Sequence, residues 1–160
     1  GIELVVDGHS YDPYSALIYK GAMLSDLPNF AFSIGYYQYS WSLKTNSTNH
    51  YVCRLLKHMD RTGARQCTPL LIDKSISERP LMALNSGYVR RGKGKVPRTG
   101  SRRPWRLWEN PFSDSFNLKY GKLTDNELAF SNTQLDDLQR TEKNSYRLKF
   151  IRCIRRFFSR

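Results

Sequence analysis

Residues 29–46 read NFAFSIGYYQYSWSLKTN, and this stretch decides the fold class that we predict. Its first part, Asn29–Ile34, is apolar and aromatic, which favours a short strand ending at Gly35. A loop follows and becomes helical near Ser40 or Ser42, since both serines are good N-caps. In α/β folds, ligands bind where strands end and helices begin. The same order also fits an ordinary connection between a strand and a helix, so both interpretations remain open.

Two helices are predicted within residues 40–121. The first runs from this point to Gly63, a natural C-cap. Its apolar residues share one face, which indicates core packing rather than cofactor binding: they are Tyr51, Val52, Leu55, Leu56 and Met59. The second helix spans residues 104–120 and ends at Gly121, and Pro111 interrupts it unless this proline lies in the first turn.

Short strands are predicted before the first helix. Ile2–Val6 is a β-branched run that ends at the turn dipeptide Asp7-Gly8. Ser15–Tyr19 is a second candidate, and Gly21 ends it. The residues alone therefore predict a mixed α/β chain, with no internal repeat.

The positive charge is concentrated in two segments. The chain has 160 residues and a formal charge of +12. Residues 85–108 hold eight basic residues and no acidic one, and residues 131–160 hold eight basic and three acidic residues. The first segment fits a solvated basic loop, or a site for phosphates or single-stranded nucleic acid on which Trp105 and Trp108 stack. It lacks the spacing of a phosphate-binding P-loop, and nucleic acid is the less favoured partner.

Residues 147–160 are predicted to form a short basic amphipathic helix. Phe150, Ile154 and Phe158 lie on its apolar side. Such a helix packs on the core or lies on an anionic membrane surface as a peripheral contact. No run of 18 apolar residues occurs, so we expect no spanning helix.

The cysteines indicate a reducing compartment. Cys53, Cys67 and Cys153 are an odd, widely spaced set, which does not suggest a disulfide framework. His50, Cys53 and His58 lack a second ligand pair, so no metal site is predicted. Because no signal peptide pattern is visible either, we expect a cytoplasmic protein with membrane association at most.

Several ordered blocks resemble a known family. GIELVVDG at residues 1–8, GYYQYSWSLK at 35–44, LNSGY at 84–88 and PRTGSRRPW at 97–105 are among them. Over roughly residues 1–130 the sequence resembles the C-terminal third of class B flavoprotein monooxygenases. The similarity is to the bacterial Baeyer–Villiger branch that includes the ethionamide-activating enzymes. The resemblance implies an oxidoreductase that holds FAD, uses NADPH and O₂, and inserts oxygen into ketones or onto sulfur through a peroxyflavin.

The resemblance also implies which residues contact the flavin. The family's flavin-side turn falls on six positions of this chain: Gly35, Tyr36, Gln38, Ser40, Trp41 and Leu43. Gly35 is expected to let the backbone approach the ring, and the helix start is expected to direct N–H groups at its pyrimidine edge. Trp41 walls the pocket or belongs to the core. Lys44 adds positive charge there or is solvated.

The family's Gly-rich fingerprints are absent from this sequence. The resemblance therefore places the FAD pyrophosphate site, the NADPH site and the catalytic arginine outside these residues, and no catalytic residue is predicted here. The expected fold is the C-terminal portion of a Rossmann-like FAD/NAD(P)-binding domain with a helical and irregular extension. Residues 1–63 would complete the FAD-binding domain, residues 64–130 form the family extension, and residues 131–160 form a divergent basic tail.

Two functional hypotheses follow from the sequence. In the first, the chain is a piece of a flavin monooxygenase, inactive by itself, and begins within a longer polypeptide because residue 1 is Gly rather than Met. In the second, it is a non-enzymatic basic module that binds anionic membrane lipid or nucleic acid.

Overall fold

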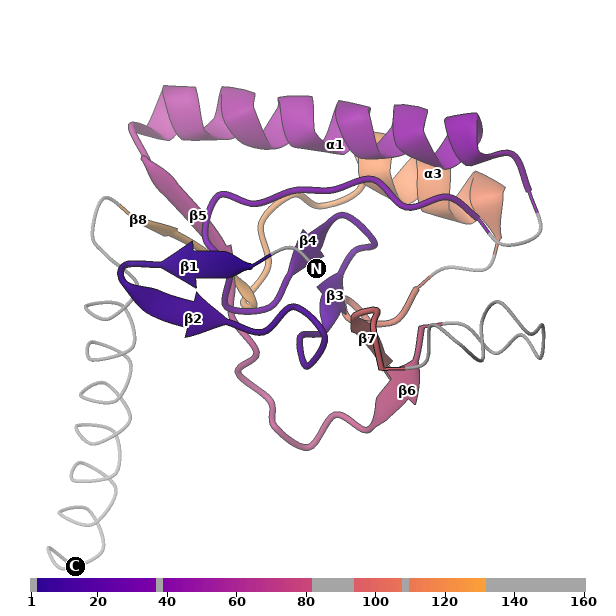
Figure 1. Cartoon of the computed structure of the whole chain (residues 1–160). Helices are drawn as coiled ribbons and strands as arrows, with labels where there is room; N and C mark the ends of the chain where they lie inside the picture. Colours follow the sequence, from indigo (N-terminus) through magenta and orange to yellow (C-terminus); the bar gives the residue numbers. More distant parts are fainter. Residues whose placement is uncertain (1–2, 37–38, 82–93, 108–109, 132–160) are drawn as a thin grey trace, which may run out of the picture.

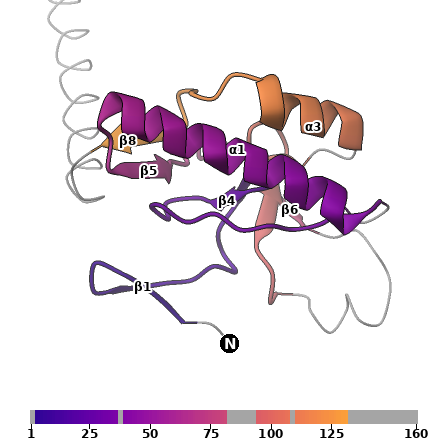
Figure 2. The same cartoon turned by 90° about the horizontal axis from the view of Figure 1, so that it is seen from above.

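A long helix covers one side of the molecule and short strands lie beneath it (Figure 1). The computed structural model describes residues 3–36, 39–81, 94–107 and 110–131. Helix α1 spans Trp41–Thr62 and helix α3 spans Pro111–Tyr120. Both views place α3 alongside α1, and strands β5 and β8 lie near the C-terminal end of α1 (Figure 2).

The described strands pair in four two-stranded antiparallel sheets. These pairs are β1 (Leu4–Val6) with β2 (His9–Tyr11), β3 (Ile18–Tyr19) with β4 (Met23–Leu24), β5 (Gln66–Pro69) with β8 (Leu128–Ser131), and β6 (Glu78–Pro80) with β7 (Arg98–Gly100). A single parallel bridge joins Leu17 to Arg98. The described part is therefore mixed α/β, and it does not display the parallel sheet expected of a Rossmann-like domain.

Local signals placed several elements correctly. The predicted turn at Asp7-Gly8 joins β1 to β2, and both residues have positive φ, as a two-residue hairpin loop requires. Helix α1 begins after Ser40 and ends at Gly63, whose left-handed backbone (φ 72°) closes the helix. The predicted apolar face is buried at Tyr51 and Leu55, whereas Leu56 is exposed.

Helix α3 begins at Pro111, so this proline lies in the first turn and does not interrupt the helix. Asn110 is the N-cap, and its Oδ1 accepts hydrogen bonds from the backbone N–H groups of Phe112 and Ser113. Proline is favoured in a first turn because its missing N–H has no helical partner there. The helix ends at Gly121, as predicted, but residues 104–107 are not part of it: Trp105 follows a cis Arg103–Pro104 bond in a turn.

The strand predicted at Asn29–Ile34 is wrong. This segment forms a turn and then irregular backbone. Asn29 has a positive φ of 53°, and its side chain binds the backbone of Cys67 and Arg65 rather than continuing a ladder. The Phe32 N–H donates to the carbonyl of Ala22, in a loop. The strand predicted at Ser15–Tyr19 is reduced to Ile18–Tyr19.

The core beneath α1 contains residues from across the chain. Tyr19 and Trp105 are fully buried, and their rings meet edge to face with centroids 5.4 Å apart. Tyr51 and Leu55 of α1 belong to the same cluster, together with Leu118 of α3. This shared core packs α3 against α1. The two helices run in the same direction, since residues early in α1 contact residues early in α3, and residues later in α1 contact residues later in α3.

Candidate functional site

The candidate site lies where the Gly35–Tyr36 backbone enters the first turn of α1. Three of the predicted residues meet there. The indole of Trp41 covers the α-carbon of Gly35, and a Cβ at position 35 would overlap its ring. This glycine therefore makes room for Trp41, a requirement that the sequence alone did not reveal.

Trp41 lies on the surface. Its side chain is 63% exposed, so the interpretation of Trp41 as a core residue is wrong. Tyr39 and Leu43 beside it are exposed as well, and the Ser40 hydroxyl pairs with that of Ser42, 2.7 Å away. The start of α1 thus presents an apolar and aromatic surface. Gln38 lies outside the described residues.

The N-cap side chain of α1 leaves the first backbone donors of the helix uncapped. Ser40 occupies the N-cap position but makes no side-chain cap hydrogen bond, and the first turn holds no acidic residue. The N–H groups of a helix start carry a partial positive charge that attracts electron-rich atoms. Among the described residues of this helix start, neither a side-chain cap nor a carboxylate compensates that charge.

A buried ionic cluster lies directly behind this turn. The Nζ of Lys44 is 2.6 Å from Oδ2 of Asp114, and the hydroxyl of Tyr36 donates to the same oxygen at 2.5 Å. Lys44 and Asp114 are 3% and 2% exposed, and Tyr36 is also buried. The interpretation of Lys44 as a solvated lysine is therefore wrong.

The surroundings shift the pKa values of Lys44 and Tyr36 in this cluster. Burial lowers the pKa of Lys44, and the adjacent Asp114 carboxylate opposes this effect. Burial raises the pKa of Tyr36, and its hydrogen bond to Asp114 raises it further. Tyr36 is thus a protonated donor, and Asp114 accepts from both neighbours. No sequence signal indicated this pairing, because Lys44 and Asp114 lie 70 residues apart.

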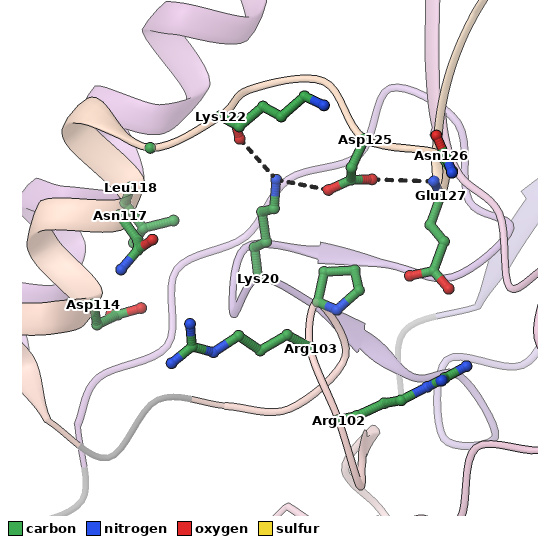
Figure 3. Close-up of a pocket in the computed structure, with 12 residues that line it drawn as sticks. Lys20, Arg102, Arg103, Asp114, Asn117, Leu118, Lys122, Asp125, Asn126 and Glu127 are labelled. Carbon is green, nitrogen blue, oxygen red and sulfur yellow. Dashed lines mark hydrogen bonds and ion pairs between the residues drawn. The ribbon is translucent and has the colours of Figure 1, made fainter.

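A cavity of about 540 Å³, lined mainly by charged and amide-bearing residues, opens beside the cluster (Figure 3). Asp114 contributes to its wall, but none of the five described residues predicted to contact flavin does. Lys20 points into the cavity, where its Nζ lies 2.9 Å from Oδ2 of Asp125 and 3.3 Å from the carbonyl of Lys122. Tyr19 donates to the same Asp125 oxygen at 2.6 Å. Lys20, Asp125 and Tyr19 thus form a second Lys–Asp–Tyr cluster, of which Lys20 and Asp125 line the cavity.

The remaining sequence predictions concern charge, metals and membranes. Trp105 is fully buried, so it does not offer a stacking face, and Trp108 lies outside the described residues. Residues 85–93 and 132–160 also lie outside them, so the amphipathic tail and the first part of the basic segment at 85–108 stay predictions. In the described part of that segment, Arg98 pairs with Glu78 and Arg102 pairs with Asp73. Among the described residues, no His, Cys, Asp and Glu side chains group as a metal site, and no helix has the length and apolarity to cross a bilayer.

Comparisons with known proteins identify relatives. The chain is 38% identical over 131 residues to the FAD-containing monooxygenase EthA of Mycobacterium tuberculosis, which covers 82% of this chain and 27% of that protein. It is 37% identical over 131 residues to EthA of Mycolicibacterium smegmatis, with the same coverage. It is 35% identical over 144 residues to a protein named "Probable FAD-binding monooxygenase AlmA" of Acinetobacter baylyi, which covers 89% of this chain and 29% of that protein.

No family model matches the chain, and no solved structure matches it. The chain spans about a quarter of the length of the curated relatives that it matches. Most of this chain is therefore homologous to one segment of the FAD-containing monooxygenases of the EthA type.

Proposed function

We propose that this chain forms the part of a flavin-dependent monooxygenase that lies against the isoalloxazine ring of FAD. The contact surface is the turn from Gly35 to Leu43, within residues 1–63, which we assign to the FAD-binding domain. The observation that carries this proposal is the start of α1, where N–H donors that the Ser40 side chain leaves uncapped lie next to the exposed indole of Trp41.

The residues at this surface fit a flavin chemically. An exposed aromatic ring offers a face for stacking or for walling the isoalloxazine. The first turn of α1 directs partial positive charge at the pyrimidine edge, where flavin reduction places negative charge. Gly35 and Tyr36 hold the turn in place, and Ser40 and Leu43 border it. Lys44 does not contact flavin in this proposal, because its ammonium is paired with Asp114.

Bound FAD, with NADPH and O₂, would supply the transfer of one oxygen atom to a ketone or to sulfur. The residues of this chain bind and orient the ring and exclude water from one side of it. We assign neither the NADPH site nor a catalytic residue to this chain.

Flavin retention tests the proposal. The purified chain is mixed with FAD and desalted, and bound flavin is detected by its absorbance bands near roughly 375 and 450 nm. We expect retained FAD, weaker retention by Trp41→Ala, and unchanged retention by Phe112→Ala, a matched loss of an exposed aromatic ring on α3. Colourless protein, or equal effects of the two variants, would contradict the proposal. Salt-sensitive binding to heparin or anionic vesicles without flavin would favour the basic-module hypothesis instead.

A further inference from the structure

We infer that Asp114 is a positioning residue for the surface at the start of α1: it fixes the Gly35–Tyr36 turn and the first turns of α1 in one arrangement. The link to flavin rests on the proposed function, whereas the anchoring rests on contacts within this chain.

One carboxylate oxygen joins three segments. Oδ2 of Asp114, in the first turn of α3, accepts from Lys44 of α1 at 2.6 Å and from the Tyr36 hydroxyl at 2.5 Å. The Tyr36 hydroxyl also lies 3.4 Å from the carbonyl oxygen of Pro111, which starts α3. Tyr36 directly follows Gly35, on which Trp41 rests. A shift of the carboxylate would therefore be transmitted to the turn and to the start of α1 together.

The cluster has little freedom to rearrange. A Cβ at Gly21 would lie 2.9 Å from the Lys44 Nζ, so the lysine occupies a space that only glycine leaves free. The ammonium also lies 5.6 Å from the Tyr36 ring centroid, within the range of a cation–π contact. Because all three side chains are buried, water does not readily replace a lost partner.

The second Lys–Asp–Tyr cluster provides matched controls. Asp125 accepts from Lys20 and from Tyr19, as Asp114 accepts from Lys44 and Tyr36, but its contacts do not reach the Gly35–Tyr36 turn. Tyr19→Phe and Asp125→Asn therefore repeat the chemical changes of Tyr36→Phe and Asp114→Asn at another place in the same protein.

The test compares these variants by hydrogen exchange and by FAD titration of the full chain. In Tyr36→Phe, which keeps the Lys44–Asp114 pair and so preserves the fold, we expect the amides of residues 39–45 to exchange on the order of tenfold faster. The FAD dissociation constant should rise about tenfold, because the free energy of one buried hydrogen bond corresponds to about a tenfold change in affinity. Asp114→Asn should have the larger effect on the exchange rate and on the FAD dissociation constant. The two control variants should leave the exchange rate and the dissociation constant unchanged.

The outcomes separate this inference from the proposed function. Unchanged exchange in Tyr36→Phe overturns the anchoring. Faster exchange with unchanged FAD affinity overturns the link to flavin, and so does an equal loss of affinity in Tyr36→Phe and Tyr19→Phe, which indicates general destabilisation. If the wild-type chain does not bind FAD at all, the proposed function fails for this chain, while faster exchange confined to the Tyr36 and Asp114 variants still supports the anchoring.

Discussion

The guanidinium of Arg54 in α1 binds Leu118 at the C-terminal end of α3, donating a hydrogen bond to its carbonyl oxygen at 2.7 Å. The same guanidinium donates to the carbonyl oxygen of Gly121 at 2.6 Å. The last carbonyl groups of a helix lack helical partners and carry partial negative charge, so a bidentate cation satisfies them well. The two ends of α3 are thus both held by α1, at Asp114 and at Leu118.

Arg54→Met should therefore destabilise the α1–α3 pair. Arg54 is half-buried, and hydrogen bonds from a charged donor of this kind are worth about 1.5–3 kcal/mol in total. Urea unfolding should show a loss of about that size in the free energy of unfolding. Lys57→Met, an exposed change of the same kind on α1, should cost less than about 0.5 kcal/mol. Equal losses would mean that the bonds to α3 contribute nothing specific.

Gly35→Ala should displace the indole of Trp41. The added methyl group would overlap the ring, and such overpacking typically costs about 1–3 kcal/mol. The fluorescence emission of this indole is isolated by subtracting the spectrum of the matching protein that carries Trp41→Phe. Comparing these difference spectra with and without Gly35→Ala reports the change at Trp41. Gly63→Ala strains a positive φ but meets no neighbouring atom, so it should reduce stability while leaving the Trp41 emission unchanged.

The chain should lose stability as the pH rises above about 10. Burial raises the pKa of Tyr11, Tyr19, Tyr36 and Tyr51 above the ordinary value of 10.0. Above that pH, the unfolded chain releases tyrosine protons that the folded chain keeps, so the stabilisation present below pH 10 is progressively lost. Circular dichroism and tyrosinate absorbance, followed together, should show that these groups ionise as the fold is lost. Ionisation of all the tyrosines near pH 10 in a folded chain would contradict the burial.

An exposed aromatic row on α3 should make the isolated chain prone to association. Phe112, Phe116 and Tyr120 lie four residues apart on one face and are 83%, 65% and 72% exposed. Contiguous apolar surface of this kind promotes association in monomeric proteins. The double variant Phe116→Ser, Tyr120→Ser should lower light scattering at high concentration without lowering the melting temperature. Lys119→Ser, a change on the same helix outside the aromatic row, should not reduce the scattering.

Much of the secondary structure followed from local sequence signals. Asp7-Gly8 placed the first hairpin, Ser40 and Gly63 bounded α1, and Gly121 ended α3, because each of these residues acts on the backbone within one turn. The strand predicted at Asn29–Ile34 failed because Asn29 turns the chain and binds the backbone of β5 instead. The apolar pattern of this segment did not indicate that Asn29 binds β5.

The sequence by itself determined the bounds of α1, the end of α3, the first turn and the relationship to flavin monooxygenases, since these depend on residues close together in the chain or on ordered blocks of them. Only the tertiary structure decided that Lys44 is buried, that Trp41 is exposed, and that Asp114 joins the two helices to the turn at Tyr36. Burial and ion pairing between residues 70 positions apart depend on how the whole chain packs, and no local pattern encodes that packing.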